Sequence, residues 1–296
     1  MDTAFGTHRC AKHLIDHPSW LTEGWKRTML RNRLECKRQS INQLLDILKN
    51  DHTQAMYITL AHHFGFHVNG APAEQMAIQT PLSVLHKHRN SLFQMSAILL
   101  GQSGLLETER YVNDEEQEEW GMLRKEYAFL QHKYNLEPIE GTLWKHGRLR
   151  PQNAPEVRVR QLAQLLYQTE FMYSRAMACQ SVAEMRELLT LQPVKEDSLL
   201  YIASAPPMGK DATDSLIINV IVPYLYAAGK REHAMAILES LPAEKNSIIR
   251  QWQTLGQRVC NAADTQALIH LYQTCCQSGQ CLNCDVAYQI FLDHHT

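Results

Sequence analysis

Apolar residues recur every three or four positions along most of this chain, and this spacing constrains the fold more than any other feature. The clearest example is the stretch from Trp20 to Leu48, where they fall on one side of a predicted helix. Another follows the acidic run Asp114 to Glu119, whose carboxylates favour a helix start. No stretch alternates as a strand would. We therefore predict an all-α protein, a multi-helix array of short antiparallel helices.

Proline and glycine residues suggest how the helices are grouped. Residues 1–17 are polar and rich in histidine, so we expect them to be extended or loosely held. A helical domain is predicted over residues 18–191, with a turn at residues 64–70. Residues 192–213, with three prolines and a glycine, are predicted to be a connection. A C-terminal helical subdomain is then expected over residues 214–296.

The charge and the apolar segments bear on where the protein acts. The 296 residues have a net charge of −2, so a contact with nucleic acid must come from a local basic patch. The N-terminal residues do not have the pattern of a signal peptide, and the longest apolar segment is too short to cross a membrane. We expect a cytoplasmic protein. Its eight cysteines are then thiols or metal ligands rather than disulfides.

Four cysteines lie close together near the C-terminus. Cys276, Cys281 and Cys284 have the spacing C-x4-C-x2-C, and the polar turn between them can bring thiolates to one metal ion. Zinc is the simplest expectation, and an iron–sulfur cluster is the second. The alternative is a set of reduced cysteines that only pack in the core. The candidates for a fourth ligand are Cys10, Cys260, His270 and Cys275.

Four arginines surround the irregular segment from Trp144 to Pro155. They are Arg148, Arg150, Arg158 and Arg160, and the last two fall at the start of the next predicted helix. Guanidinium groups beside a helix N-terminus form a favourable site for phosphate or carboxylate. The alternative is that these arginines pair with glutamates and hold the segment to the core.

Sequence motifs of common enzymes are absent from the chain. There is no phosphate-binding glycine loop, no nucleophile elbow and no His-Glu-x-x-His zinc motif. A catalytic triad cannot be assigned from the many serines and histidines. The sequence therefore assigns no catalytic residue.

An ordered set of short segments resembles the bacterial domain of unknown function family 2851. The segments are Phe64-Gly-Phe-His-Val-Asn69, Gly101-Gln-Ser-Gly-Leu105, Glu126-Tyr-Ala-Phe-Leu130, Arg148-Leu-Arg-Pro-Gln-Asn153, Leu241-Pro-Ala-Glu-Lys-Asn-Ser-Ile248 and Cys276 to Cys284. The resemblance implies that members are longer, with a β-rich, nuclease-like N-terminal region that this sequence lacks. It also implies that Arg160 departs from the family pattern, which tends to have alanine there.

These features together favour a helical module that binds a partner and does not catalyse a reaction. The partner is expected to be nucleic acid or a nuclease-like protein domain, contacted by the four arginines, and the cysteines are expected to hold a structural metal. One alternative is a metal-dependent enzyme centred on Cys276, Cys281 and Cys284. Another is a purely structural or oligomerising protein.

Overall fold

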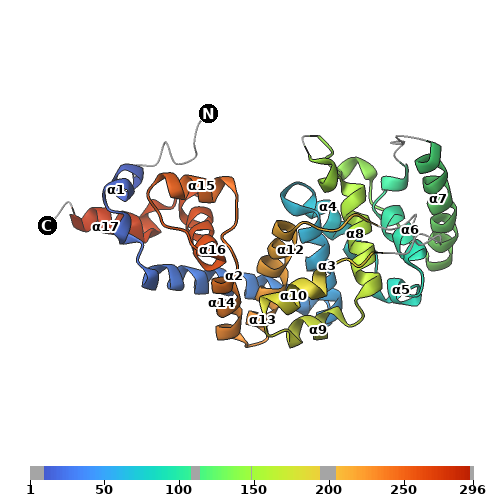
Figure 1. Cartoon of the computed structure of the whole chain (residues 1–296), viewed down its shortest axis with the longest axis horizontal. Helices are drawn as coiled ribbons and strands as arrows, with labels where there is room; N and C mark the ends of the chain where they lie inside the picture. The colour runs from blue at the N-terminus through green and yellow to red at the C-terminus, as the bar shows by residue number, and fades with distance from the viewer. Residues whose placement is uncertain (1–9, 108–113, 148, 194–204, 294–296) are drawn as a thin grey trace. The chain divides into compact units, whose positions relative to one another are not determined.

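The structure is a computed structural model that describes residues 10–107, 114–147, 149–193 and 205–293, apart from the side chains of His67, Glu115 and Glu116. These ranges consist of helices joined by short connections, as Figure 1 shows. They contain no β-sheet, and an antiparallel bridge between Pro242 and Asn261 is isolated. The all-α prediction is confirmed.

The chain divides into two compact units. The first comprises Met1–Gln43 with Val222–Thr296, and the second comprises Leu44–Ile221. The predicted connection at residues 192–213 falls within the second unit, and the structure describes 192, 193 and 205–213 of it. Prolines mark local breaks in a helix pattern, whereas a unit is defined by packing between segments far apart in sequence.

The first unit joins the two ends of the chain around one apolar core. Its buried residues include Leu14, Trp252, Leu268 and Val286, which form a single cluster. Its helical elements are α1 (Cys10–Asp16), η1 (Pro18–Trp20), most of α2 (Glu23–Ile47), α13 (Val222–Ala227), α14 (Arg231–Ser240), α15 (Ser247–Thr254), α16 (Ala262–Leu271), η6 (Tyr272–Cys276), η7 (Cys281–Asn283) and α17 (Asp285–Asp293).

Helix α1 differs from the extended segment predicted for residues 1–17. Leu14 is fully buried, and α1 packs against α17, as Figure 1 shows. The apolar partner of α1 is therefore at the opposite end of the chain. A short polar sequence gains helical structure through such packing, which local composition does not reveal.

The second unit is built on two sets of extensive helix contacts. Helix α3 packs on α4, and α6 packs against both α7 and α8. A side chain at Gly101 of α6 would lie 2.1 Å from the Tyr127 ring of α7, so glycine permits this close approach. The helical elements are α3 (His52–Phe64), α4 (Phe66–Gln79), α5 (Leu82–Lys87), α6 (Leu92–Gln102), η2 (Leu105–Glu107), α7 (Asp114–Tyr134), η3 (Gly141–Leu143), η4 (Pro151–Asn153), α8 (Pro155–Gln168), α9 (Met172–Ala178), α10 (Val182–Leu189), α12 (Lys210–Leu216) and η5 (Ile217–Ile221).

Residues 64–70 were predicted to be a turn, and this prediction is wrong in part. Helix α3 ends at Phe64, but α4 begins only two residues later, at Phe66. A Cβ atom on Gly65 would lie 2.1 Å from the carbonyl oxygen of Asn69. The missing side chain lets the chain change direction at Gly65. Phe66 has a left-handed φ of 52° and Asn69 a non-helical φ of −118°, so the first turn of α4 is kinked where the turn was predicted. The aromatic Phe64 is buried.

Candidate functional site

The predicted cysteine site lies in the first unit, where the chain reverses after α16. Gly279 has a φ of 66° in the turn between η6 and η7. The Gln280 N–H donates to the Cys275 carbonyl at 2.9 Å. This bond brings Cys281 back toward the end of η6, as we predicted from the polar sequence between Cys276 and Cys281.

A fifth cysteine joins these four from the other end of the chain. Cys10 begins α1 and packs, with Cys275 and Cys276, against the apolar cluster that contains Cys284. Cys284 is buried, whereas Cys281 is exposed. The packing of α1 on α17 thus places Cys10 with the C-terminal thiols.

The thiols affect one another's ionisation. Burial, and to a smaller extent the nearby thiols of Cys10, Cys284, Cys275 and Cys281, raise the pKa of Cys276 to about 12. Burial also raises the pKa of Cys284 to about 11, to which Cys275 and Cys10 contribute. At neutral pH these groups are protonated thiols. Because the thiolate is the nucleophile, Cys276 and Cys284 are weak nucleophiles in this environment.

The other two candidates for a fourth ligand have different surroundings. His270 is buried, and its pKa is lowered by burial and by Arg33. Cys260 is exposed, and its backbone N–H donates to the Asp264 carboxylate at 2.8 Å. Of the candidates outside residues 275–284, Cys10 is the one whose charge acts on Cys276 and Cys284.

The positions of the thiols also bear on metal binding. Among the residues that the structure describes, no group of three or more His, Cys, Asp and Glu side chains is arranged to hold a metal ion. A metal would therefore require the cysteines to move closer together. The prediction of zinc or an iron–sulfur cluster stays a prediction.

The structure gives the three described arginines of the predicted anion site different surroundings. Arg148 lies outside the described residues, and Arg150 is exposed just before η4. Arg160 forms an ion pair with Glu119 of α7 at 2.5 Å, and its guanidinium lies over the Trp120 ring. Arg160 therefore has the structural role that the alternative interpretation gave it.

Arg158 has neutral partners instead. Its guanidinium donates to the side-chain oxygens of Gln161, at 2.7 Å, and of Asn153. It also lies 4.2 Å from the centre of the Phe66 ring. The residue is only 8% exposed, and burial lowers its pKa to about 10, so it stays charged at neutral pH. None of these three partners offsets the positive charge.

The start of α8 adds to this local positive potential. No side chain caps it, because Ala154 occupies the N-cap position. The first N–H groups of a helix are the positive end of its dipole. Glu156 in the first turn reduces the potential in part, and its carboxylate lies 2.7 Å from His146.

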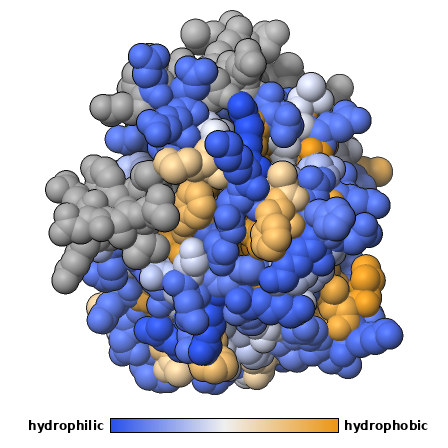
Figure 2. All heavy atoms as spheres, turned by 90° about the vertical axis from the view of Figure 1, so that its right-hand side faces the viewer, coloured by the Kyte–Doolittle hydropathy of each residue, from blue (hydrophilic) through white to orange (hydrophobic). Residues whose placement is uncertain are grey.

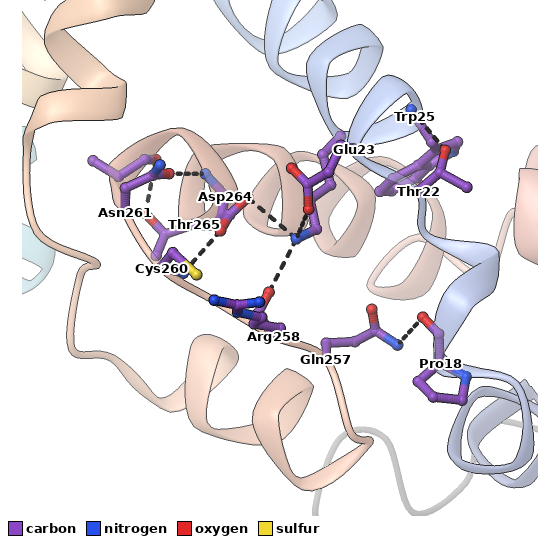
Figure 3. Close-up of polar contacts among 12 residues, drawn as sticks. Pro18, Thr22, Glu23, Trp25, Gln257, Arg258, Cys260, Asn261, Asp264 and Thr265 are labelled. Atoms are coloured by element: carbon purple, nitrogen blue, oxygen red, sulfur yellow. Dashed lines mark hydrogen bonds and ion pairs between the residues drawn. The ribbon is translucent and has the colours of Figure 1, made fainter.

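A buried ion pair that was not predicted joins α2 to α16 in the first unit. Lys26 lies 3.2 Å from Asp264, and their side chains are only 7% and 9% exposed. Its ammonium also contacts the exposed Glu23 and donates to the Arg258 carbonyl at 3.0 Å. Figure 3 shows these three oxygens converging on one nitrogen.

The surroundings of this pair explain its role. Asn261 caps α16 by accepting from the Asp264 N–H at 3.0 Å, while Asp264 accepts from the Cys260 N–H. Lys26 and Asp264 also line a cavity of about 230 Å³. Glu23, Asp264 and Arg258, which contact Lys26, all belong to the first unit. The Lys26–Asp264 pair therefore holds α2 to the capped start of α16.

Two further cations of α2 meet one amide of α16. Arg33 and Lys37 donate to the Gln266 side-chain oxygen at 3.3 and 3.2 Å. The Gln266 amide in turn donates to Glu244 at 2.6 Å. Lys37 is half-buried, and this burial, followed by repulsion from Arg33, lowers its pKa to about 7. A lysine with this pKa loses part of its charge near neutral pH.

Comparisons with known proteins identify the family. The family model described as a protein of unknown function (DUF2851) matches residues 2–247. Searches of curated proteins and of solved structures gave no match. No helix in the described ranges is long and apolar enough to span a membrane. The match ends before the cysteine segment, whose role the family model does not address. Because the matched residues are most of the sequence, the chain belongs to the DUF2851 family of proteins of unknown function.

Proposed function

We propose that this chain is a non-catalytic helical module that binds nucleic acid at the start of α8. The supporting observation is the buried guanidinium of Arg158, whose contacts with Asn153, Gln161 and Phe66 leave its positive charge in place. Burying a charge costs several kcal/mol unless an opposite charge compensates for it. A nucleic-acid phosphate near the start of α8 would provide that compensation.

The two described arginines of this site have different roles in the proposal. Arg150 is exposed and contacts a phosphate oxygen directly. Arg158 is buried and attracts the phosphate through its electric field, together with the uncapped helix start. Arg160 takes no part, because its charge is paired with Glu119.

The character of the surface is compatible with a polar partner. Figure 2 views the α7 side of the molecule, where hydrophilic side chains dominate and apolar ones form small separate patches. A stable interface with another protein commonly has a larger apolar centre. The visible part of this face has no large apolar centre of that kind. A nuclease-like domain remains the second candidate.

A salt series tests the proposal. Short labelled single- and double-stranded DNA and RNA are titrated with the protein at increasing salt, and the affinity should fall steeply. Arg150→Gln should weaken binding and reduce the slope of log affinity against log salt by about 1. Arg175→Gln, at another exposed arginine of the second unit, is the matched control and should change little.

Two outcomes would contradict the proposal. If none of the four probes binds at low salt, the partner is not nucleic acid, and a protein domain becomes the better candidate. If Arg150→Gln and Arg175→Gln weaken binding equally, attraction is non-specific and the start of α8 is not the site.

We also propose that Cys10, Cys276, Cys281 and Cys284 hold a structural zinc ion. The supporting observation is that α1 and α17 bring the thiol of Cys10 into the electrostatic range of the others. Zinc binds thiolates, so binding releases the protons that these thiols hold and draws the four sulfurs together. The ion would then fasten α1 to the C-terminal segment.

Metal analysis of the purified protein tests this second proposal. We expect about one zinc per chain, lost in Cys10→Ser but kept in His270→Gln and in Cys36→Ser, whose thiol is exposed on α2. Iron with visible absorption would indicate an iron–sulfur cluster instead. Absence of both metals, also after reconstitution under reducing conditions, would show that the cysteines only pack.

A further inference from the structure

The second unit contains a cavity at the opposite end of α8 from the proposed nucleic-acid site. Its volume is about 650 Å³, within the range of small-molecule sites. It is an open cavity bordered by α3, α5, the last turn of α8, and the segment that leads into α9. The cavity is independent of the function proposed for the start of α8.

The floor of the cavity is apolar and rich in sulfur. Six of the lining residues are at most 8% exposed, and they are the apolar or aromatic Met56, Tyr57, Leu60, Leu82 and Met172 and the polar Thr169. Thioethers make favourable contacts with aromatic rings, and methionine adapts to the shape of a ligand. A tyrosine ring in the same floor offers edge-to-face or stacked packing. This floor suits a flat aromatic group better than a sugar or a phosphate.

The mouth of the cavity has one permanent charge of each sign, Arg89 and Glu170, and the exposed side chain of His86. Arg89 forms an ion pair with Glu170, and their side chains are 54% and 53% exposed, so both reach solvent. An exposed pair of this kind contributes little to stability and can exchange its partners for a ligand. One cation already matched by one anion does not suit a polyphosphate. It does suit a ligand that carries both charges.

The end of α8 indicates where the positive end of such a ligand lies. Residues 166–168 at the C-terminus of α8 line the cavity, and Glu170 follows them directly. The C-terminal end of a helix is negative and favours a cation. An ammonium group is therefore stabilised beside Glu170, while a carboxylate is stabilised by Arg89.

Phe171 at the mouth has a strained backbone. Its φ of 56° and ψ of 42° are left-handed, which is costly for an aromatic residue, and its side chain is 66% exposed. Such strain often occurs where a binding site holds a group in position. The exposed ring adds a second aromatic surface at the entrance.

We propose that this cavity binds a free aromatic amino acid. The ring packs on Met56, Tyr57 and Met172, the ammonium pairs with Glu170, and the carboxylate pairs with Arg89. The three parts of the ligand are matched by the apolar floor, the helix end with its glutamate, and the arginine.

Calorimetric titration with three related probes tests each part. L-Tryptophan has both charges, tryptamine lacks the carboxylate, and indole-3-propionate lacks the ammonium. We expect L-tryptophan to bind about tenfold more tightly than either of the others, since each loses one charged contact. L-Leucine, which has the same charged groups without a ring, should bind more weakly than L-tryptophan.

Substitutions of Glu170 and Arg89 test which residue binds the ammonium and which binds the carboxylate, and they leave the apolar core unchanged. Glu170→Gln should weaken L-tryptophan and tryptamine about tenfold and leave indole-3-propionate unchanged. Arg89→Gln should weaken L-tryptophan and indole-3-propionate and leave tryptamine unchanged. Circular dichroism of both variants should match the wild type, because neither side chain is buried.

Two results would overturn the proposal. The first is that L-tryptophan at millimolar concentration does not bind the wild-type protein. The second is that the two variants affect all three probes alike. This would show that Arg89 and Glu170 do not bind the carboxylate and the ammonium of the ligand.

Discussion

Lys26 in the first unit and Arg158 in the second are buried to the same degree but have different partners. The Lys26 ammonium meets the carboxylate of Asp264 at 3.2 Å. The Arg158 guanidinium meets two amide oxygens and an aromatic ring. A charge opposed by a charge stabilises the packing of two helices. A charge that is surrounded only by neutral dipoles is not cancelled. Its positive electrostatic potential can attract an anion from outside the unit.

The first prediction removes the acid from the compensated pair and has the largest expected effect. Asp264→Ala should lower the free energy of unfolding by about 3 kcal/mol, because it leaves the ammonium of Lys26 buried without its carboxylate. Urea denaturation followed by circular dichroism measures this change.

Glu23→Ala is the matched control, because Glu23 contacts the same nitrogen at 3.1 Å from an 86% exposed position. An exposed ion pair contributes little, so this variant should change stability by less than about 1 kcal/mol. Equal effects of the two substitutions would show that burial does not distinguish these carboxylates.

The second prediction removes the uncompensated cation. Arg158→Met should lower the free energy of unfolding by about 1 kcal/mol. The loss of the ring contact and of two hydrogen bonds is partly offset, because a charge is no longer buried. It should also weaken binding of labelled DNA or RNA at low salt. A loss as large as that for Asp264→Ala would show that Arg158 is mainly structural, and unchanged nucleic-acid binding would remove it from the proposed site.

The third prediction concerns the pH dependence of stability and Lys37, whose charge is neither fully compensated like that of Lys26 nor fully kept like that of Arg158. The pKa of Lys37 is lowered to about 7 in the folded protein, against about 10.4 in an unfolded chain. Folding therefore releases a proton from Lys37 between about pH 7 and pH 10, and the contribution of Lys37 to stability rises with pH across this window.

Lys37→Met removes this dependence, so it should stabilise the protein by about 1 kcal/mol at pH 6 and by less as the pH rises toward 9. Unfolding in urea at several pH values checks this. Lys125→Met, at an exposed lysine of α7, is the control and should show no such trend. A constant difference for Lys37→Met across the range would contradict the lowered pKa.

The sequence predicted most helices because each has its own apolar spacing and start signal. Ser181, for example, caps α10 by accepting from the Glu184 N–H, and the Glu184 carboxylate accepts from the Gln180 N–H. The sequence did not reveal α1, whose packing partner α17 lies more than 250 positions away. Nor did it reveal the early start of α4, which depends on the space that Gly65 leaves for Asn69.

The candidate sites could be predicted only where their members are neighbours in sequence. The turn that returns Cys281 toward Cys275 was predicted, but the place of Cys10 depends on the packing of α1. The same limit applied to Arg160, whose partner Glu119 is on another helix. Lys26 had a signal that was missed, because it is in phase with the buried Leu30 and Leu34 of α2.

The last prediction extends the comparison from charges to hydroxyl groups, and its expected effect is the smallest. Tyr57 and Tyr127 are both buried, and burial raises both pKa values. The Tyr127 hydroxyl donates to the Gln102 side-chain oxygen at 2.9 Å. The Tyr57 hydroxyl has no hydrogen-bond partner in the part of the chain that the structure describes.

Tyr127→Phe should therefore cost about 1 kcal/mol, since it leaves the buried oxygen of Gln102 without this donor. Tyr57→Phe should change the free energy of unfolding by less than about 0.5 kcal/mol, or increase it slightly. It removes a buried hydroxyl that forms no hydrogen bond to offset its loss of hydration. Urea denaturation of the two variants side by side measures the difference. If Tyr57→Phe costs as much as Tyr127→Phe, an ordered water bonds the Tyr57 hydroxyl. The floor of the cavity in the second unit would then be wetter than its apolar side chains indicate.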